Sequence, residues 1–304
     1  MTPEPDEQLV SVDGHQLKLK RLDKVLYPEA GTTKAQVLDY YARIAAVLLP
    51  QLADRPVTRI RWPDGTDSHP FFEKNIPSYA PSWLRTVRLP TPGSSRQLET
   101  LLFPVFRSTA DLIWMVNLAA LELHVPQWTV GPRGAVRNPN RLVIDLDPGA
   151  PAGLAECAEV ATLVRDRLAA DGLSAIPVTS GSKGLQLYAA LDGSQSADVV
   201  HDYARRLAES LSRQHPQLIV DRMTKTLRVG KVLLDWSQNN PAKTTICPYS
   251  MRGRAMPWVA APRTWDELSA PGLSQLDTAE VLRRVERDGD LAVTLLHGSA
   301  RLPA

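Results

Sequence analysis

Apolar residues recur with a helical period near the start of the chain. Between residues 32 and 50 they stand three or four positions apart, which predicts an amphipathic helix capped by Thr32 or Thr33. A second helix is expected from about residue 108 to residue 123, where apolar residues again share one face. The apolar face of the first helix consists of Val37, Tyr40, Tyr41, Ile44, Val47 and Leu48.

Shorter elements surround these two helices. A hairpin is predicted for VDGHQLKLKRL, with Asp13 and Gly14 at its turn. A strand that ends in a turn is predicted for RPVTRIRWPDG, and a loop is expected for HPFFEKN after it. The N-terminal part of the chain is therefore expected to mix helices with short strands.

From residue 141 onward, strands and helices alternate. We predict a strand for RLVIDLDPG, a helix through residues 157–168, and a strand, a glycine-rich turn and a strand for IPVTSGSKGLQLYAAL. A helix around residues 198–212 leads to LRVGKVLLDWSQ, which is expected to form a pair of strands. This β-α-β-β-α-β order predicts a ferredoxin-like module, whose mostly antiparallel sheet carries its helices on one face. Residues 263–304 are expected to be helical and peripheral.

Composition places the chain among ordinary globular proteins. Its 304 residues, 43% hydrophobic and 22% charged, suit one large domain or two closely packed modules, and a net charge of +2 does not by itself indicate nucleic acid as a partner. Cys157 and Cys247 are too few for a disulfide framework and lack zinc-site spacing, which favours a reduced, cytoplasmic setting. The N-terminus does not resemble a signal or transit peptide. No apolar run approaches the roughly 20 residues that cross a membrane.

Two carboxylates interrupt the strand predicted for RLVIDLDPG. Asp145 and Asp147 are two positions apart, so both side chains point to the same face of the strand, about 6.6 Å apart along it. Carboxylates this close in apolar surroundings repel each other and lose hydration, and a divalent cation would offset both costs. The alternative is that both residues lie at a solvated strand end before the turn.

A third acidic residue favours the metal interpretation. Asp235 interrupts the apolar run KVLL, and if its strand neighbours that of Asp145, three carboxylates converge. Oxygen ligands favour Mg²⁺ or Mn²⁺ over zinc, and two such ions about 3.5–4 Å apart can hold the attacking and leaving oxygens of a phosphoryl transfer. Polymerases and nucleases share this arrangement, so the acids alone do not choose between them.

A glycine-rich turn in TSGSKGLQLY offers a site for an anion. Gly181 and Gly184 let backbone N–H groups face a phosphate, and Lys183 adds a full charge between them. The spacing differs from that of a Walker A loop, and a strand follows in place of a helix. An ordinary hairpin is the alternative for this turn taken alone.

In combination, four motifs resemble a known family. The segments DLDPG, TSGSKGLQLY, LRVGKVLLDWSQN and KTTICPYSMRGR resemble the polymerase domain of bacterial DNA ligase D, a branch of the archaeo-eukaryotic primase superfamily. The resemblance implies an α/β (α+β) fold with mostly antiparallel sheets. It implies one domain over residues 1–304, with a DNA-end-binding module in about 1–130, a catalytic module in about 131–262 and a helical segment in 263–304. Because no ligase or phosphoesterase sequence follows, a stand-alone relative is expected.

The resemblance also implies roles for individual residues. For Phe71, Phe72 and His124, the alternative is a place in the hydrophobic core. The family's catalytic and metal-holding acids match Asp145, Asp147 and Asp235, and its nucleotide contacts match Ser180, Lys183, Arg228, His124, Arg252 and Arg254. Its DNA contacts match Lys24 and Lys34, which would bind a 5′-phosphate, and Phe71 and Phe72, which would stack on the template.

Two positions depart from the family pattern. Gln186 stands where relatives usually have histidine, which removes a titratable group and keeps hydrogen bonding. Ile60 stands between Arg59 and Arg61, where relatives tend to have lysine, and is expected to weaken or reshape template contacts. Neither departure alters the three acids.

The resemblance implies a DNA-dependent polymerase that adds ribo- or deoxyribonucleotides to 3′ ends at gaps and breaks, with two Mn²⁺ or Mg²⁺ ions. The implied partners are NTP or dNTP, 5′-phosphorylated gapped or broken DNA, Ku and a DNA ligase, in end joining or gap-filling repair. Three alternatives stay open: a primase that makes primers de novo, a metal-dependent nuclease, and a non-catalytic end-binding module, which the three intact acids disfavour.

Overall fold

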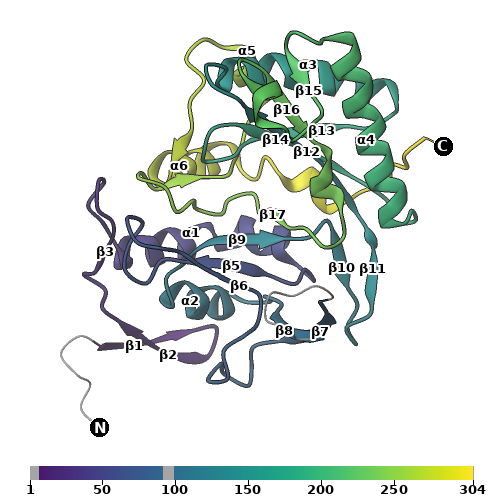
Figure 1. The fold of residues 1–304 in the computed structure, drawn as a ribbon. Helices are drawn as coiled ribbons and strands as arrows, with labels where there is room; N and C mark the ends of the chain where they lie inside the picture. The colour runs from purple at the N-terminus through teal and green to yellow at the C-terminus, as the bar shows by residue number, and fades with distance from the viewer. Residues whose placement is uncertain (1–6, 92–98, 304) are drawn as a thin grey trace.

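The strand that carries Asp145 lies inside a six-stranded sheet in the computed structural model, which describes residues 7–91 and 99–303 (Figure 1). All neighbouring strands of this sheet are antiparallel except the pair β15–β16. In spatial order the strands are β15 (Ile219–Val220), β16 (Val232–Asp235), β12 (Arg141–Pro148), β14 (Leu185–Ala190), β13 (Ala175–Thr179) and β19 (Ala261–Pro262).

The predicted ferredoxin-like module is confirmed within this sheet. Along the chain, β12, helix α3 (Leu154–Ala170), β13, β14, helix α4 (Ala197–Gln214) and β16 follow the expected β-α-β-β-α-β order. Both helices cover the same face of the sheet, where they bury Leu142, Ile144 and Leu146 of β12 in one core. Because side chains alternate along a strand, Asp145 and Asp147 point to the opposite face.

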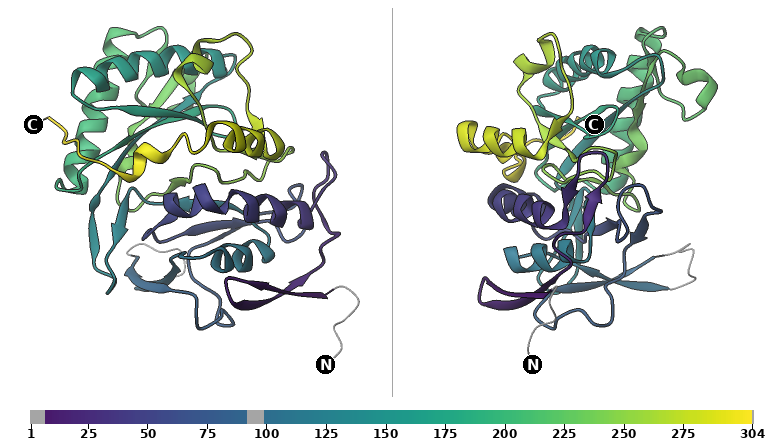
Figure 2. Two further views of the ribbon diagram at one scale, coloured as in Figure 1. Left: turned by 180° about the vertical axis from the view of Figure 1, so that it is seen from behind. Right: turned by 90° about the vertical axis from the view of Figure 1, so that its left-hand side faces the viewer.

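A second sheet forms the N-terminal half of the molecule. It is antiparallel and contains, in spatial order, β17 (Thr245–Ile246), β9 (Ala120–Val125), β5 (Thr58–Arg61) and β6 (Phe71–Glu73). Helices α1 (Lys34–Leu52) and α2 (Thr109–Asn117) pack on each other beside it (Figure 2). Thr33 caps α1 as predicted, in a capping box with Gln36. The largest core joins residues of both halves, and Val143 of β12 is buried in it together with Leu121 and Leu123 of β9.

Two-stranded pairs and short helices complete the fold. The predicted N-terminal hairpin is confirmed, with Asp13 and Gly14 at positive φ in its turn. The pairs are β1 (Glu7–Val12) with β2 (His15–Lys20), β3 (Val25–Tyr27) with β4 (Thr32–Thr33), β7 (Thr86–Pro90) with β8 (Thr100–Pro104), β10 (Trp128–Val130) with β11 (Val136–Pro139), and β18 (Trp258–Val259) with β20 (Leu276–Asp277). The short helices are η1 (Lys225–Arg228), η2 (Trp236–Asn239), α5 (Trp265–Ser269), α6 (Thr278–Asp288) and η3 (Val293–Leu296).

The prediction of one helix over residues 108–123 is wrong in its second half. Helix α2 ends at Asn117, Ala119 adopts a positive φ of 60°, and residues 120–125 form strand β9. Strand β9 is central in its sheet, and successive side chains along most of its length are buried, so both of its faces are covered. A strand buried in this way is a nearly continuous apolar run, and the hydrophobic pattern of such a run does not distinguish it from a helix.

Three further expectations are corrected. The segment HPFFEKN contains strand β6 instead of being only a loop, and β6 pairs with β5 alone at the sheet edge. In LRVGKVLLDWSQ only VLLD is a strand, because the residues before it form η1 and a turn. The C-terminal segment is partly helical but not peripheral, since Leu295 and Leu302 are buried in the two main cores. Among the described helices, none is both long enough and apolar enough to cross a membrane.

Candidate active site

The sheet register brings the first and third predicted acids face to face. Strands β12 and β16 run antiparallel with Asp145 directly opposite Asp235, and Asp147 lies opposite Leu233. Asp147 is two residues from Asp145, so the three carboxylates belong to one face of two neighbouring strands. The expectation that the two acid-bearing strands are neighbours is therefore confirmed.

Asp145 lies in a strongly unfavourable environment for a negative charge. Burial raises its pKa to about 7, with added repulsion from Asp235 and Asp147, although a hydrogen bond from Gln186 and the nearby Arg252 act in the opposite direction. In the described part of the chain, no lysine, arginine or histidine forms an ion pair with Asp145 or Asp235. A pair of facing carboxylates without a cation is an arrangement that a divalent metal ion would stabilise.

The other two acids have hydrogen-bond partners of their own. Asp147 accepts from Arg228 Nη2 at 2.5 Å. Asp235 is 7% exposed and accepts from the amide of Ser237 at 3.0 Å, from its hydroxyl, and from Gln238 Nε2 at 2.9 Å. Among the residues that the structure describes, no three acidic, histidine or cysteine side chains stand close enough together to hold a metal ion as they are oriented here. The donor set itself, oxygen only and excess in negative charge, fits Mg²⁺ or Mn²⁺.

The glycine-rich turn of residues 180–184 packs directly on the acid-bearing strand. A Cβ at Gly184 would stand 1.9 Å from the carbonyl oxygen of Leu146, between the two aspartates of β12, and Gly181 has a φ of +67°. Lys183 is exposed at the tip of the turn. The turn therefore lies close to the acids, and it requires glycine at both positions because of the backbone contact at Gly184 and the positive φ at Gly181.

The backbone of the turn is less available to an anion than the glycines suggest. The Gly181 N–H donates to Gln275 Oε1 at 2.7 Å, the Ser182 N–H to Ser180 Oγ at 3.3 Å, and the Ser180 N–H to the Gly184 carbonyl at 3.0 Å. Three of the N–H groups are thus engaged inside the protein. The groups left to meet a phosphate are mainly side chains, above all the ammonium group of Lys183.

Arg228 approaches the acids from helix η1. Its side chain bonds Asp147, and its backbone lies so close to Gly149 that a Cβ there would be 2.0 Å from the Arg228 carbonyl oxygen. The structure therefore places Arg228, which was predicted to bind a phosphate group, at the end of the acid-bearing strand.

His124 and Arg252 meet at a residue that the sequence analysis did not single out. Glu122 accepts from His124 Nε2 at 2.8 Å and lies 3.4 Å from Arg252 Nε. Burial raises the pKa of Glu122, but His124, Arg252 and the Gly253 N–H outweigh it and lower that pKa to about 2. Its position inside the apolar run ALELHV is the sequence feature from which a buried, functional glutamate could have been predicted. Arg254, two residues beyond Arg252, is exposed.

Lys24 and Lys34 form a separate basic cluster at the start of helix α1. The Lys34 amide donates to the Lys24 carbonyl at 2.8 Å, and Lys34 Nζ donates to the Lys20 carbonyl at 2.6 Å. Lys24 Nζ pairs with Asp64 at 2.9 Å. Burial lowers the pKa of Lys34 to about 8, helped by the charges of Arg21 and Lys24. Cations at a helix N-terminus attract an anion.

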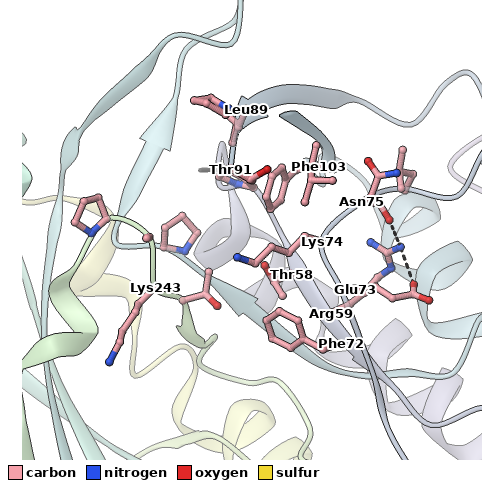
Figure 3. A pocket seen from close by; sticks show the side chains of 18 of the residues that line it. Thr58, Arg59, Phe72, Glu73, Lys74, Asn75, Leu89, Thr91, Phe103 and Lys243 are labelled. Atoms are coloured by element: carbon pink, nitrogen blue, oxygen red, sulfur yellow. Dashed lines mark hydrogen bonds and ion pairs between the residues drawn. The ribbon is translucent and has the colours of Figure 1, made fainter. Parts of the chain in front are cut away.

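The two adjacent phenylalanines are surface residues. Phe71 and Phe72 are 53% and 58% exposed on the edge strand β6, so neither occupies the core, and Lys74 Nζ lies 5.9 Å from the Phe72 ring centroid. Phe72 borders a cavity of about 910 Å³ between β6, the β7–β8 pair and the loop before β17 (Figure 3). Its lining includes Lys74, Phe103, Trp128 and Lys243. Figure 3 shows Lys74 directed into this cavity.

The two departures from the family pattern occupy central positions. Gln186 lies opposite Asp145 in the β12–β14 register, is 5% exposed, and accepts from the Tyr188 hydroxyl at 2.8 Å. Ile60 lies opposite Phe72 on one side and Glu122 on the other. One departure thus touches the acids, and the other separates the exposed aromatic residues from the Glu122 cluster.

Comparison with known proteins agrees with this geometry. A family model described as LigD, primase-polymerase domain, matches residues 33–292. The chain is 49% identical over 286 residues to the multifunctional non-homologous end joining protein LigD of Mycobacterium bovis, covering 92% of this chain and 37% of that protein. It is 33% identical over 277 residues to the bifunctional non-homologous end joining protein LigD of Bacillus subtilis, covering 90% and 43%.

A solved structure matches the fold as well as the sequence. The polymerase domain of Mycobacterium tuberculosis ligase D in complex with DNA aligns with a TM-score of 0.87 at 49% identity, over 92% of this chain and 98% of that domain. The chain spans less than half the length of these curated relatives and almost all of the solved domain. The chain therefore belongs to the LigD primase-polymerase domain family.

Proposed function

We propose that this chain is a DNA-dependent nucleotidyltransferase that adds ribo- or deoxyribonucleotides to DNA 3′ ends at gaps and breaks. The observation that carries the proposal is the placement of Asp145 opposite Asp235, with Asp147 on the same face, beside an exposed lysine turn. The solved polymerase domain of Mycobacterium tuberculosis ligase D is in complex with DNA, which supports DNA as the substrate.

Asp145, Asp147 and Asp235 would hold two divalent ions, Mn²⁺ or Mg²⁺. Bound there, such ions would supply a lowered pKa to the primer 3′-hydroxyl and charge stabilisation to the α-phosphate. Lys183, Arg228 and Ser180 would bind the β- and γ-phosphates so that pyrophosphate leaves in line. Arg228 already donates to Asp147, so it would exchange that carboxylate for phosphate oxygens. Glu122 accepts a hydrogen bond from His124 and forms an ion pair with Arg252, and these two residues, with Arg254, would complete the proposed nucleotide site.

DNA would contact two further surfaces. Lys24 and Lys34 would bind the 5′-phosphate at the far side of a gap, where the start of helix α1 adds its own positive potential. Phe71 and Phe72 would stack on template bases, which contributes about 1–3 kcal/mol per base without reading sequence. The cavity beside Phe72, with its aromatic and basic lining, has the character of a surface that accepts a nucleic-acid strand.

The names of the relatives suggest a biological setting for the enzyme. We place the enzyme in end joining or gap-filling repair, with Ku and a DNA ligase as partners, because the curated relatives are named for non-homologous end joining. The buried free cysteines Cys157 and Cys247 support a reduced, cytoplasmic location. We further propose that residues 1–304 act as one domain, because the largest core includes side chains from both halves.

Extension of a labelled primer on gapped DNA with Mn²⁺ and each of the eight ribo- and deoxyribonucleotides tests the proposal. The wild-type chain should lengthen the primer, and Asp235→Ala should not, while both bind the gapped DNA with similar affinity. Shortening of the primer would indicate the nuclease alternative, and products made without any primer would indicate a primase. Extension by Asp235→Ala at the wild-type rate would refute the assignment of the acids.

A further inference from the structure

One side chain from the C-terminal segment holds both ends of the glycine-rich turn. Gln275 Oε1 accepts from the Gly181 N–H at 2.7 Å, and Gln275 Nε2 donates to the Gly184 carbonyl at 3.1 Å. Ser182 and Lys183 lie between the two bridged residues. A single amide therefore spans the turn from outside, and no role in the proposed reaction has so far been given to it.

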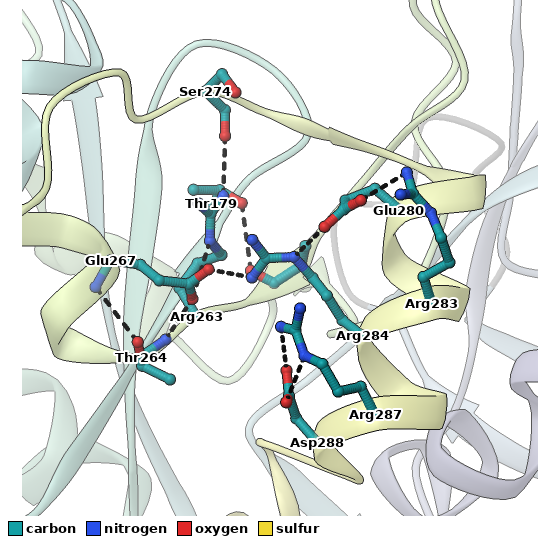
Figure 4. Close-up of polar contacts among 11 residues, drawn as sticks. Thr179, Arg263, Thr264, Glu267, Ser274, Glu280, Arg283, Arg284, Arg287 and Asp288 are labelled. Atoms are coloured by element: carbon teal, nitrogen blue, oxygen red, sulfur yellow. Dashed lines mark hydrogen bonds and ion pairs between the residues drawn. The ribbon is translucent and has the colours of Figure 1, made fainter.

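The segment that carries Gln275 is itself fixed in place. On one side of Gln275, Leu276 pairs with Val259 in the β18–β20 ladder. On the other side, the carbonyl of Ser274 accepts a hydrogen bond from Arg263 Nη1 at 2.9 Å. Arg263 is 7% exposed and lies 3.4 Å from Glu267, which also accepts from Arg284 of helix α6 (Figure 4). Gln275 is thus held by a strand pair on one side and a charged network on the other.

The turn has little freedom on its other sides. Gly184 packs against β12, and a Cβ at Gly181 would stand 2.5 Å from Arg252 Cγ and 2.9 Å from the Val259 carbonyl oxygen. Gly181 and Gly184 are both buried, so the groups that Gln275 bonds have no ready access to water. Removal of the amide takes away the acceptor of the Gly181 N–H and opens space on the one side from which the turn was held, so the turn and Lys183 become free to shift in that direction.

We propose that Gln275 is a positioning residue for nucleoside triphosphate, because it fixes the turn from which Lys183 reaches the β- and γ-phosphates. This inference rests on the proposed function of the turn. Gln275 does not itself contact the nucleotide: it acts through the backbone of residues 181 and 184. A misplacement of about 1 Å at such a site strongly lowers the rate at which the bound reactant is converted.

Gln195 offers a matched control within the same chain. Its amide makes an equivalent bridge, accepting from the Leu302 N–H at 2.8 Å and donating to the Leu302 carbonyl at 3.1 Å, and it is partly buried like Gln275. Gln195→Ala therefore loses the same two bonds to backbone away from the turn. Calorimetric titration with ATP in the presence of Mn²⁺ should give a Kd raised about tenfold for Gln275→Ala, and a Kd near the wild-type value for Gln195→Ala.

The loss of affinity in Gln275→Ala should depend on the β- and γ-phosphates of the nucleotide. Titration with AMP, which lacks the β- and γ-phosphates, should give nearly the same Kd in Gln275→Ala and wild type. In a Lys183→Ala background, Gln275→Ala should weaken ATP binding much less than it does alone, because both changes remove one interaction. If Gln275→Ala does not fold, Gln275→Met keeps the length of the side chain and serves in its place.

Several results would overturn the inference: a wild-type Kd for ATP in Gln275→Ala, an equal loss in Gln195→Ala, or full additivity with Lys183→Ala. Primer extension separates this inference from the proposed function. A wild-type chain that binds ATP in the predicted manner but never extends a primer refutes polymerase activity and leaves Gln275 as a triphosphate-positioning residue. A chain that extends primers normally while Gln275→Ala binds ATP as wild type refutes only the role of Gln275.

Discussion

The two sheets of the molecule place their charges in opposite ways. In the four-stranded sheet, opposite charges meet: Glu73 bonds Arg59 at 2.8 Å and Arg61 at 2.7 Å, and Glu122 pairs with Arg252 and accepts a hydrogen bond from His124. In the six-stranded sheet, Asp145 faces Asp235 across the ladder without an ion pair to either among the described residues. Like charges directly opposite in a sheet are destabilising. One sheet therefore uses charge to hold itself together, and the other leaves negative charge unbalanced, as a cation-binding site requires.

The largest expected effect comes from neutralising the unbalanced sheet. Asp145→Asn should lower primer extension on the order of 10³-fold, because the proposed metal ligand is lost. The same change should stabilise the fold by roughly 2 kcal/mol above pH 7, because it removes a buried charge that faces Asp235. Guanidinium unfolding monitored at several pH values, beside extension assays, measures both effects.

The sign of the pH dependence follows from the raised pKa. Because Asp145 titrates at about 7 in the folded state, above its ordinary value of 3.8, its proton stabilises the fold at low pH, and that stabilisation is lost as pH rises through 7. The advantage of Asp145→Asn should therefore shrink as pH falls towards 4. Asp166→Asn, on the exposed surface of α3, is the control and should change neither property. A less stable Asp145→Asn at pH 8 would contradict the comparison.

Breaking the balanced sheet should have the opposite consequence. Glu122→Gln leaves the buried Arg252 without its anion and should destabilise the fold by about 3 kcal/mol. Chemical denaturation at pH 7 measures the loss, and Glu29→Gln at an exposed position is the matched control. Stability equal to that of the wild type would show that these charges do not hold the sheet.

The smallest expected effect concerns Lys34, a positive charge that lies outside both sheets. Lys34 is protonated below its lowered pKa of about 8, so its attraction for a 5′-phosphate should fade as pH rises from 7 to 9. The ratio of affinities for 5′-phosphorylated and unphosphorylated gapped DNA should fall about threefold over that range at constant salt. In Lys34→Arg, whose guanidinium stays charged, the ratio should not change with pH. A ratio that is independent of pH in the wild type would rule out this role for Lys34.

Local sequence patterns predicted most of the catalytic module because its elements are regular. The alternation around Asp145, the turn at Gly181 and the helical periods of α3 and α4 each have one simple structural interpretation. The N-terminal half is harder to predict because both faces of β9 are covered, and the resulting apolar run has no period that separates a strand from the end of a helix. The exposed Phe71 and Phe72 in β6 lack a pattern that separates an edge strand from a loop.

Long-range contacts explain what the sequence did not reveal at the site. Glu122 meets Arg252 across 130 positions of sequence, and Gln275 meets Gly181 across 94, so neither pairing leaves a local pattern. Spacing and resemblance indicated the proposed roles of Asp145, Asp147 and Asp235, but only the fold shows that Asp145 lies opposite Asp235.

Gly149 and Gly184 limit which substitutions this part of the protein can accept. With a backbone carbonyl about where each Cβ would be, residues 149 and 184 admit no side chain unless η1 or the turn swings away from β12. Substitutions in this neighbourhood are therefore tolerated only at positions without such a contact, such as the half-buried Ser182. A library built to change nucleotide choice should vary that residue and leave both glycines untouched, because a single methyl group at either would spread the loops that frame the acids.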